Sequence, residues 1–232
     1  MQTSALQVTR VFFQTINLGQ TCIAPDYLLV DTEIKDQLLE LMKERLEYKP
    51  YEDGSDHYVS IINQRNFDRL LGLIDKEKIY FGGKQNETTR YIEPTILTNV
   101  FWEDAVMQDE IFGPILPVLT YSDFDQALEK LLHFEKPLAA YLFSNTKSQK
   151  DKFLSKFSFG GGCINDTLMH IANQHLPFGG IGNSGMGSYH GAFGFDAFSH
   201  KKAVIKKSNW LEPDIKYPPY SETKAKWIKR LL

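Results

Sequence analysis

Three apolar runs in the middle of the chain, LPVLTY (116–121), LAAYLF (138–143) and GGCIN (161–165), have the pattern of buried β-strands. The segments between them carry apolar residues at the three- and four-residue spacing of a helix face, and Asp123 stands where it can cap the first helix. Strands that alternate with helices over short connections are typical of right-handed crossovers in a parallel sheet. This stretch therefore predicts an α/β fold with a parallel sheet and flanking helices.

The sequence on the N-terminal side of this stretch predicts further elements of the same two kinds. In chain order we expect a helix within 5–17, a strand at 27–30, a helix that Asp31 or Thr32 can cap, a helix with an apolar stripe over 62–74, and strands at 78–81 and 91–100. Pro94 lies inside the last of these strands. Because proline donates no backbone hydrogen bond, this strand is expected at an edge or in an irregular ladder.

The alternation stops beyond Asn165, and the C-terminal part of the chain has a different character. It contains a glycine-rich loop, a short helix near 192–198, a strand at 203–207 and a polar tail with prolines. We therefore expect a main domain over 1–200, followed by a C-terminal strand and tail over 201–232.

The composition is that of an ordinary globular protein: 232 residues, 42% of them hydrophobic and 24% charged, with a formal net charge of −3. The slight negative charge gives no electrostatic reason to expect nucleic acid as a partner. Two cysteines do not make a disulfide framework in a chain of this length, which favours a reducing compartment. The sequence has no apolar run near the roughly 18 residues of a membrane span and no signal-peptide pattern at its start. We therefore expect a cytoplasmic protein without a transmembrane anchor.

The string GQTCIAPDY (19–27) places Cys22 among small residues, directly before the first predicted strand. A nucleophilic thiol must be accessible and needs backbone N–H groups to hold the oxyanion that develops on a carbonyl substrate. The alternative is a buried, unreactive cysteine, which is the commoner fate of a free thiol. From the residue types alone, both interpretations remain open.

A second candidate is the string EIFGP (110–114), in which Glu110 and Phe112 lie two positions apart before a Gly-Pro turn. Two such side chains can face one cleft, where a carboxylate accepts hydrogen bonds from ribose hydroxyls and a ring packs on a nicotinamide face. The alternative is a solvated glutamate beside a phenylalanine of the core.

Two further stretches are weaker candidates. The string PFGGIGNSGMG (177–187) contains a G-x-G-x-x-G pattern, but no buried strand is expected before it, so we do not interpret it as a dinucleotide fingerprint. Cys163 lies in a predicted strand; a redox partner for Cys22 is conceivable, and a silent core thiol is favoured. Asn165, just after that strand, can line a substrate mouth. The histidines have no ligand-like spacing, so no metal site is expected.

The string around Cys22 closely resembles the catalytic-cysteine segment of aldehyde dehydrogenases, particularly of the class 3 and fatty-aldehyde branch. EIFGP resembles the nicotinamide-side motif of the family, and PFGGIGNSGMG resembles its PFGGxxxSG loop beside the active site. The strings YIEPT, EKPLA, YHG and FDAFSH, which begin at residues 91, 135, 189 and 195, match the same branch. The motifs stand in the family's order, and the resemblance runs from about residue 5 to residue 219.

The resemblance implies oxidation of aldehydes, medium- or long-chain or aromatic ones, to carboxylic acids with NAD or NADP. Cys22 would attack the carbonyl to give a thiohemiacetal and then a thioester, and its backbone N–H would be one oxyanion donor. Glu110 would hold the nicotinamide ribose, and Phe112 would lie against the ring. Residues 1–200 would form the catalytic domain, and residues 201–232 would be part of the arm that joins two subunits into a homodimer.

The chain departs from the family pattern on the N-terminal side of Cys22. In the family the cofactor-binding domain precedes the cysteine, whereas here only one predicted helix does. The sequence has no counterpart of the glycine-rich nucleotide turn, of the asparagine that completes the oxyanion hole, or of the general-base glutamate in a LELGGK-like string. We therefore expect the catalytic and C-terminal part of an aldehyde dehydrogenase, a fragment that is inactive alone. Two alternatives are a non-catalytic dimerisation partner of an intact relative and, ranked last, a cofactor-free cysteine hydrolase, for which no base is identifiable.

Overall fold

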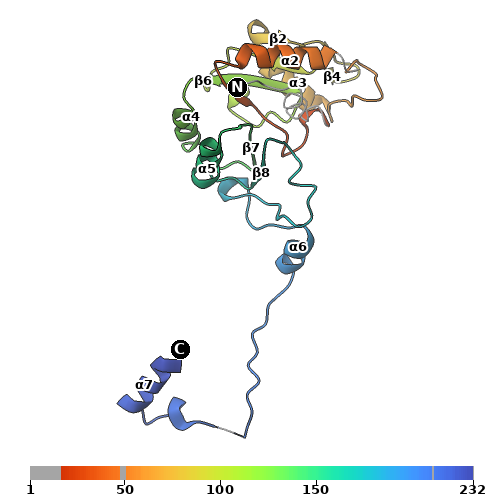
Figure 1. The fold of residues 1–232 in the computed structure, drawn as a ribbon. Coiled ribbons are helices and arrows are strands. Elements are labelled where there is room, and N and C mark those ends of the chain that lie inside the picture. Colours follow the sequence, from red (N-terminus) through yellow and green to blue (C-terminus); the bar gives the residue numbers. More distant parts are fainter. Residues whose placement is uncertain (1–16, 48–50, 211, 232) are drawn as a thin grey trace. The chain divides into compact units, whose positions relative to one another are not determined.

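The computed structural model describes residues 17–47, 51–210 and 212–231 (Figure 1). These residues divide into two compact units, the first ending at Phe198 and the second beginning at Ser199. The helix expected within 5–17 lies outside the described residues except for Asn17, which begins a single 3-10 turn.

The first unit contains helices and strands that largely follow the expected order. They are β1 (Leu28–Asp31), α2 (Lys35–Glu47), α3 (Gln64–Leu73), η2 (Lys76–Lys78), β2 (Ile79–Phe81), β3 (Gln85–Asn86), β4 (Tyr91–Ile92), β5 (Thr95–Leu97), η3 (Ala105–Met107), β6 (Ile115–Tyr121), α4 (Phe124–Leu131), β7 (Ala139–Leu142), α5 (Lys147–Lys156), β8 (Gly161–Ile164), η4 (Gly182–Ser184) and α6 (Gly191–Ala197).

A four-stranded sheet in the order β1-β6-β5-β2 is the centre of this unit. Strand β6 pairs in parallel with β1 on one side and with β5 on the other, and β2 pairs antiparallel with β5. All residues of β6 from Ile115 to Leu119 are buried, as expected for a strand that is covered on both faces of a sheet. The predicted α/β class, with parallel pairing and flanking helices, is confirmed.

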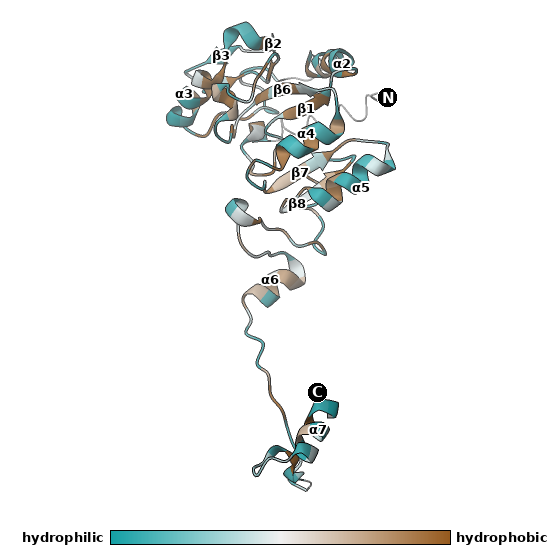
Figure 2. Cartoon of the chain, turned by 90° about the vertical axis from the view of Figure 1, so that its left-hand side faces the viewer, coloured by the Kyte–Doolittle hydropathy of each residue, from teal (hydrophilic) through white to brown (hydrophobic). Residues whose placement is uncertain are grey.

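Alternate side chains of β6 enter two different cores, because successive residues of a strand point to opposite faces. Leu116 and Val118 pack into a core with α2, and Ile115 and Leu119 pack into a core with α3. Figure 2 shows the hydrophobic strands β1 and β6 beside helices that carry hydrophilic residues. The helices contribute Leu38, Leu39, Met42 and Leu46 from α2, and Phe67 and Leu70 from α3.

Strands β7 and β8 form a separate two-stranded parallel sheet, with α5 as their crossover. Helices α4 and α5 cover it through a third core that contains Leu128, Ala140 and Phe153. The parallel pairing predicted for this stretch is therefore confirmed between β7 and β8, whereas β6 and β7 belong to different sheets among the described strands. The hydrophobic pattern identifies each strand as buried, but it carries no information on which neighbour supplies the hydrogen bonds.

Two details of the predicted helix starts have different outcomes. Asp123 caps α4 as expected, and its carboxylate accepts a hydrogen bond from the Gln126 N–H (2.8 Å). Asp31 does not cap α2: it ends β1, accepts from the Glu33 N–H (3.0 Å), and the helix begins only at Lys35. The carboxylate thus stabilises the turn between strand and helix, as Asp side chains commonly do.

Pro94 divides the strand expected over 91–100, as its missing N–H suggested. Strand β4 pairs antiparallel with β3, whereas β5, directly after the proline, joins the central sheet between β6 and β2. Of the two positions expected for this strand, the structure therefore has the irregular ladder and not the sheet edge.

The second unit contains η5 (Asp214–Lys216) and α7 (Glu222–Leu231). Lys224 joins them, since its ammonium contacts the Asp214 carboxylate (2.8 Å) and donates to the Tyr217 carbonyl (2.9 Å). The strand expected at 203–207 is wrong for this structure, in which the segment has no regular secondary structure. A strand needs a partner for its N–H and C=O groups, and the described chain supplies none there. None of the helices in the described ranges combines the length and the apolar character needed to cross a membrane.

Candidate active site

Cys22 lies on a β-turn that we call the cysteine turn (Thr21–Ala24), closed by a hydrogen bond from the Ala24 N–H to the Thr21 carbonyl (2.9 Å). Its thiol is exposed. The next residue, Ile23, is only 1% exposed, and Leu18 before the turn is fully buried. Burial of such side chains typically contributes 1.5–3 kcal/mol each. The apolar residues around the turn therefore fix the backbone while the thiol faces solvent, which excludes the interpretation of Cys22 as a buried core residue.

Gln20 connects the cysteine turn to the segment that precedes α3. Its side-chain oxygen accepts a hydrogen bond from the Ile62 N–H (2.9 Å), and its amide donates to the Ser60 carbonyl (3.4 Å). Both groups of one carboxamide are thus used to hold the backbone just before the thiol.

The segment just before the cysteine turn and the 110–114 loop (Glu110–Pro114) meet at two glycines. Gly19 has a φ of +69°, and a Cβ at this position would lie 2.4 Å from the Gly113 carbonyl oxygen. A residue with a side chain would clash and would also be strained at this φ. The fold therefore brings together the two motifs that the sequence singled out, although they lie far apart in the chain.

The backbone of the 110–114 loop is held from both sides. The Asp26 carboxylate accepts a hydrogen bond from the Ile111 N–H (2.9 Å), and the Arg69 guanidinium donates to the Ile111 carbonyl (2.6 Å) and the Glu110 carbonyl (3.4 Å). Ile111 is buried, whereas Glu110 and Phe112 on either side of it are exposed. Phe112 is 40% exposed with a φ of +50°, so it is not the core residue of the alternative interpretation.

Asp26 has an unusual titration. Burial raises the pKa of its carboxyl to about 6, the nearby charge of Glu110 adds to this, and the Ile111 N–H and the Arg69 charge oppose it. A carboxylate that is desolvated and yet holds a backbone amide is a strong determinant of local geometry. Asp26 thus couples the segment after Cys22 to the segment that presents Glu110 and Phe112.

Strands β7 and β8 contribute a second set of groups next to the cysteine turn. The Tyr141 hydroxyl of β7 donates a hydrogen bond to the Ile23 carbonyl (2.7 Å). Cys163 of β8 stands in register with Tyr141 and is half-buried, with its sulfur 3.7 Å from Nδ1 of His170. Burial raises the pKa of the Cys163 thiol, which disfavours its thiolate.

His170 and Asn165 complete the surroundings of Cys163. His170 is 8% exposed, burial lowers its pKa, and within the described part of the chain its Nε2 has no hydrogen-bond partner. Asn165 accepts a hydrogen bond from the Ser144 N–H (2.8 Å) through its side-chain oxygen. That oxygen therefore stabilises the end of β7; the suggestion that Asn165 lines a substrate mouth stays a prediction.

Comparison with known proteins identifies the family. Residues 4–204 match the sequence profile described as "Aldehyde dehydrogenase family". The chain belongs to the aldehyde dehydrogenase family. It is 47% identical over 222 residues to the 4,4'-diaponeurosporen-aldehyde dehydrogenase of Staphylococcus aureus, with 94% of this chain and 48% of that protein covered. It is 44% identical over 208 residues to the dimeric NADP-preferring aldehyde dehydrogenase of Rattus norvegicus, with 88% and 46% covered.

A solved structure agrees with this assignment. The substrate-bound state of Staphylococcus aureus AldH matches with a TM-score of 0.93 and 44% identity, over 98% of this chain and 50% of that one. The chain thus spans about half the length of the aldehyde dehydrogenases that it matches.

The glycine-rich loop of this aldehyde dehydrogenase chain lacks the context of a dinucleotide fingerprint, as expected. Within the described residues no regular strand directly precedes it, and only the short 3-10 helix η4 follows within it. A Cβ on Gly160 would lie 2.2 Å from the Gly179 carbonyl oxygen. The loop therefore packs directly against the backbone just before β8.

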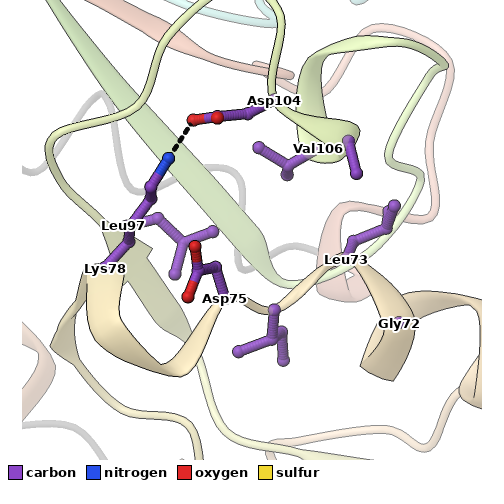
Figure 3. A pocket seen from close by; sticks show the side chains of 9 residues that line it. Gly72, Leu73, Asp75, Lys78, Leu97, Asp104 and Val106 are labelled. Carbon is purple, nitrogen blue, oxygen red and sulfur yellow. Dashed lines mark hydrogen bonds and ion pairs between the residues drawn. The ribbon is translucent and has the colours of Figure 1, made fainter.

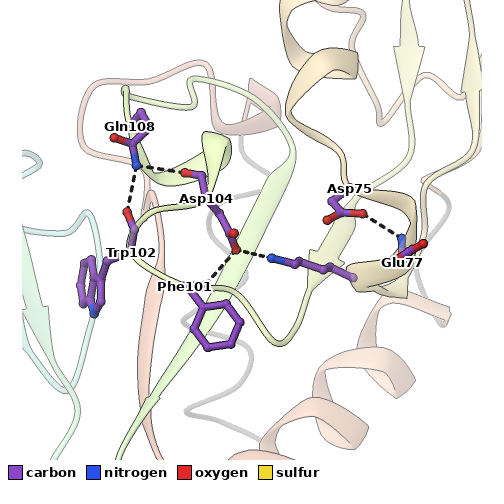
Figure 4. A network of polar contacts seen from close by, with 7 residues as sticks. Asp75, Glu77, Phe101, Trp102, Asp104 and Gln108 are labelled. Carbon is purple, nitrogen blue, oxygen red and sulfur yellow. Dashed lines mark hydrogen bonds and ion pairs between the residues drawn. The ribbon is translucent and has the colours of Figure 1, made fainter.

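A pocket of about 140 Å³ lies apart from these motifs, between the end of α3, η2 and η3 (Figure 3). Asp104 at its edge accepts hydrogen bonds from the Lys78 ammonium (2.5 Å) and the Phe101 N–H (2.8 Å), and the Lys78 bond lowers the pKa of its carboxyl. Gln108 donates to the carbonyls of Trp102 (2.9 Å) and Asp104 (Figure 4). This network fixes the segment that leads into Glu110, and we interpret it as structural.

Sequence patterns identified Cys22, Glu110 and Phe112 but not the residues that hold them. Asp26 lies inside the GQTCIAPDY string, so the family motif itself was a signal for its importance. Arg69 and Tyr141 carry no comparable local signal, because each acts on a backbone carbonyl that lies far away in the sequence.

Proposed function

We propose that the protein to which this chain belongs oxidises aldehydes to carboxylic acids with NAD or NADP, and that Cys22 is its nucleophile. The observation that carries this proposal is an exposed thiol on an anchored turn, preceded by a segment whose Gly19 packs directly against the loop that presents Glu110 and Phe112. Membership of the aldehyde dehydrogenase family supports the reaction class.

The thiolate of Cys22 would add to the aldehyde carbonyl, so that a carbon–sulfur bond forms and the carbonyl oxygen becomes an oxyanion. The Cys22 N–H would donate a hydrogen bond to this oxygen. Loss of hydride from the adduct leaves a thioester on Cys22, and attack of water on the thioester releases the carboxylic acid and the free thiol. When bound, NAD or NADP supplies the hydride acceptor.

The residues of the 110–114 loop fit a nicotinamide nucleotide. Glu110 offers an exposed carboxylate that can accept bonds from ribose hydroxyls, and Phe112 offers an exposed ring face. Both side chains lie on a backbone that is fixed by Asp26 and Arg69, so the loop would lose little conformational freedom on binding the nucleotide. Most of the nucleotide would be bound by sequence that precedes the cysteine in relatives.

We further propose a homodimer with residues 201–232 as the segment that joins the subunits, and a cytoplasmic location. The rat relative, which is named as a dimeric and NADP-preferring enzyme, supports the dimer and the cofactor class. Medium- or long-chain or aromatic aldehydes are the proposed substrates, on the resemblance to the class 3 branch.

The test uses this chain alone and the same chain fused behind the N-terminal half of the S. aureus relative, with formation of reduced nicotinamide as the measurement. The chain alone should form none, because loss of an oxyanion donor costs about 10²–10³ and loss of a general base about 10²–10⁴. The fusion should turn over, and Cys22→Ala should lower its rate on the order of 10⁴-fold or more.

Cys163→Ala in the fusion is the matched control, and it should keep the rate within about twofold, as a thiol outside the reaction would. A folded fusion that binds the cofactor but does not turn over would favour the non-catalytic dimerisation partner. Turnover that survives Cys22→Ala would show that another group is the nucleophile.

A further inference from the structure

Tyr141 joins strand β7 to the cysteine turn by one hydrogen bond. Its hydroxyl donates to the carbonyl oxygen of Ile23 at 2.7 Å, across a sequence separation of 118 residues. Ile23 is the third residue of the cysteine turn, and Cys22 is the second. The bond therefore fixes the peptide group on the C-terminal side of the thiol, as Gln20 fixes the backbone on its N-terminal side.

The surroundings of Tyr141 keep its hydroxyl in the donor role. Burial raises the pKa of this phenol, so it stays protonated through the neutral range, and a backbone hydrogen bond from Leu168 satisfies the oxygen. The ring lies beside His170, with the two ring centroids 5.9 Å apart, and the strand register places it next to Cys163. A side chain held from three directions is rigid, which a positioning group requires.

The geometry of the turn indicates what this bond controls. The closing bond of the turn uses the Ala24 N–H and the Thr21 carbonyl, and thus neither polar backbone group of Cys22. The orientation of the Cys22 N–H therefore depends on how the whole turn is held. Misplacement of a reacting group by about 1 Å can lower the rate on the order of a hundredfold in a reaction that needs defined geometry.

We propose that Tyr141 is a positioning residue for the reaction at Cys22: its hydroxyl holds the cysteine turn so that the Cys22 N–H can bind the oxyanion. This inference rests on the proposed function of Cys22 as nucleophile. It assigns to Tyr141 no contact with substrate or cofactor.

Two reactions of the same thiol separate positioning from simple reactivity. Alkylation by iodoacetamide requires an accessible thiolate and develops no oxyanion. Acylation by p-nitrophenyl acetate forms a tetrahedral oxyanion before p-nitrophenolate leaves, so it depends on the backbone donor. A positioning residue should affect the second reaction and spare the first.

The experiment compares Tyr141→Phe with Tyr91→Phe in the fusion of this chain behind the N-terminal half of the S. aureus relative. Tyr91 is the matched control because its hydroxyl also donates a 2.7 Å bond to a distant backbone carbonyl, that of Tyr51, which lies outside the cysteine turn. Tyr141→Phe should slow the acylation burst by roughly threefold to tenfold and change alkylation by less than about twofold, the scale of one neutral hydrogen bond. Tyr91→Phe should leave both rates within about twofold of the parent, although both variants lower the thermal midpoint.

Three outcomes would overturn the assignment of Tyr141. Acylation could be equal in the two variants, or Tyr141→Phe could slow alkylation as much as acylation. The third concerns 3-fluorotyrosine at position 141, which keeps the ring and the donor and should retain the parent rate of acylation; a slow reaction would show that packing of the ring, and not the hydroxyl bond, sets the rate. A parent fusion whose Cys22 is alkylated but never acylated would instead contradict the proposed function of Cys22.

Discussion

The two cysteines of this chain differ in the exposure of the thiol and in the contacts that position it. Cys22 is exposed on a turn whose flanking residues Leu18 and Ile23 are buried. Cys163 is half-buried on β8 beside the imidazole of His170, and burial raises the pKa of its thiol. In the first case the backbone is fixed and the sulfur is accessible; in the second the sulfur itself is packed.

This difference shows that an accessible thiol can be positioned by contacts to the main chain around it. In the described part of the chain the Cys22 side chain has no anchoring contact of its own; Gln20, Gly19 and Tyr141 hold the backbone around it, and Asp26 ties the segment after it to the 110–114 loop. Cys163 is placed instead by the β7–β8 pairing and by the packing of that sheet. A nucleophile that must stay accessible has to be held through its main chain.

The largest expected effect concerns Asp26, whose pKa of about 6 lies above the ordinary 3.8. Because folding favours the protonated form, this group adds stability below about pH 4, and the addition is lost as pH rises through about 6. The difference corresponds to at most about 3 kcal/mol. Asp26→Asn keeps the acceptor for the Ile111 N–H but cannot titrate, so the stability of the variant should fall less between about pH 4 and pH 7 than that of the parent. The measurement is the free energy of unfolding in denaturant across this pH range.

Asp104→Asn is the control with the opposite sign. The bond from Lys78 lowers the pKa of Asp104, so this group contributes stability at neutral pH that is lost as pH falls. If both variants shift the pH dependence in the same direction, the assignment of Asp26 as a desolvated carboxylate that holds the 110–114 loop is wrong.

A smaller effect is expected at Glu110, which lies on the loop that packs against the segment before Cys22. In the fused enzyme, Glu110→Gln removes the charge while keeping the shape, and should weaken cofactor binding about tenfold to a hundredfold, the range of a charge-assisted hydrogen bond of roughly 1.5–3 kcal/mol. The measurement is the dissociation constant of NAD or NADP together with the KM of the aldehyde. Asp109→Asn, a neighbouring exposed carboxylate, should change neither by more than about twofold. A large change in aldehyde KM with unchanged cofactor binding would show that Glu110 contacts the substrate and not the cofactor.

The smallest expected effect is the most direct test of the comparison itself. Iodoacetamide at neutral pH should modify Cys22 about tenfold or more faster than Cys163, because Cys22 is exposed and burial disfavours the Cys163 thiolate. Peptide mapping by mass spectrometry follows both sites in one sample. Equal or reversed rates of modification would contradict the assignment of Cys22 as the accessible thiol and of Cys163 as the packed one.

Much of the secondary structure could be predicted because apolar periodicity and cap residues are local signals. The Asp123 cap, the split at Pro94 and the parallel β7–α5–β8 unit all follow from a few neighbouring residues. The strand expected at 203–207 failed for the opposite reason. A strand depends on a partner, and the described chain offers none to this segment.

The candidate site divides in the same way. Cys22, Glu110 and Phe112 were identified from short strings that resemble family motifs, and the structure brings their two loops together at Gly19 and Gly113. Arg69 and Tyr141 were missed because each is a common residue whose role appears only in its distant backbone partner. Their functional roles, like those of the three predicted residues, stay predictions until the variants are measured.

The sequence by itself determined the α/β class, most of the order of the helices and strands as far as α6, and the family, because these depend on local apolar patterns and on motifs that can be recognised in isolation. Only the tertiary structure decided which strands pair, which glycines touch, and which side chains hold the cysteine turn. Those contacts join residues far apart in the chain, and their geometry depends on how β6 packs α2 and α3 on its two faces while β7 and β8 pair in a sheet of their own. A local pattern contains neither the identity of a distant partner nor the distance to it.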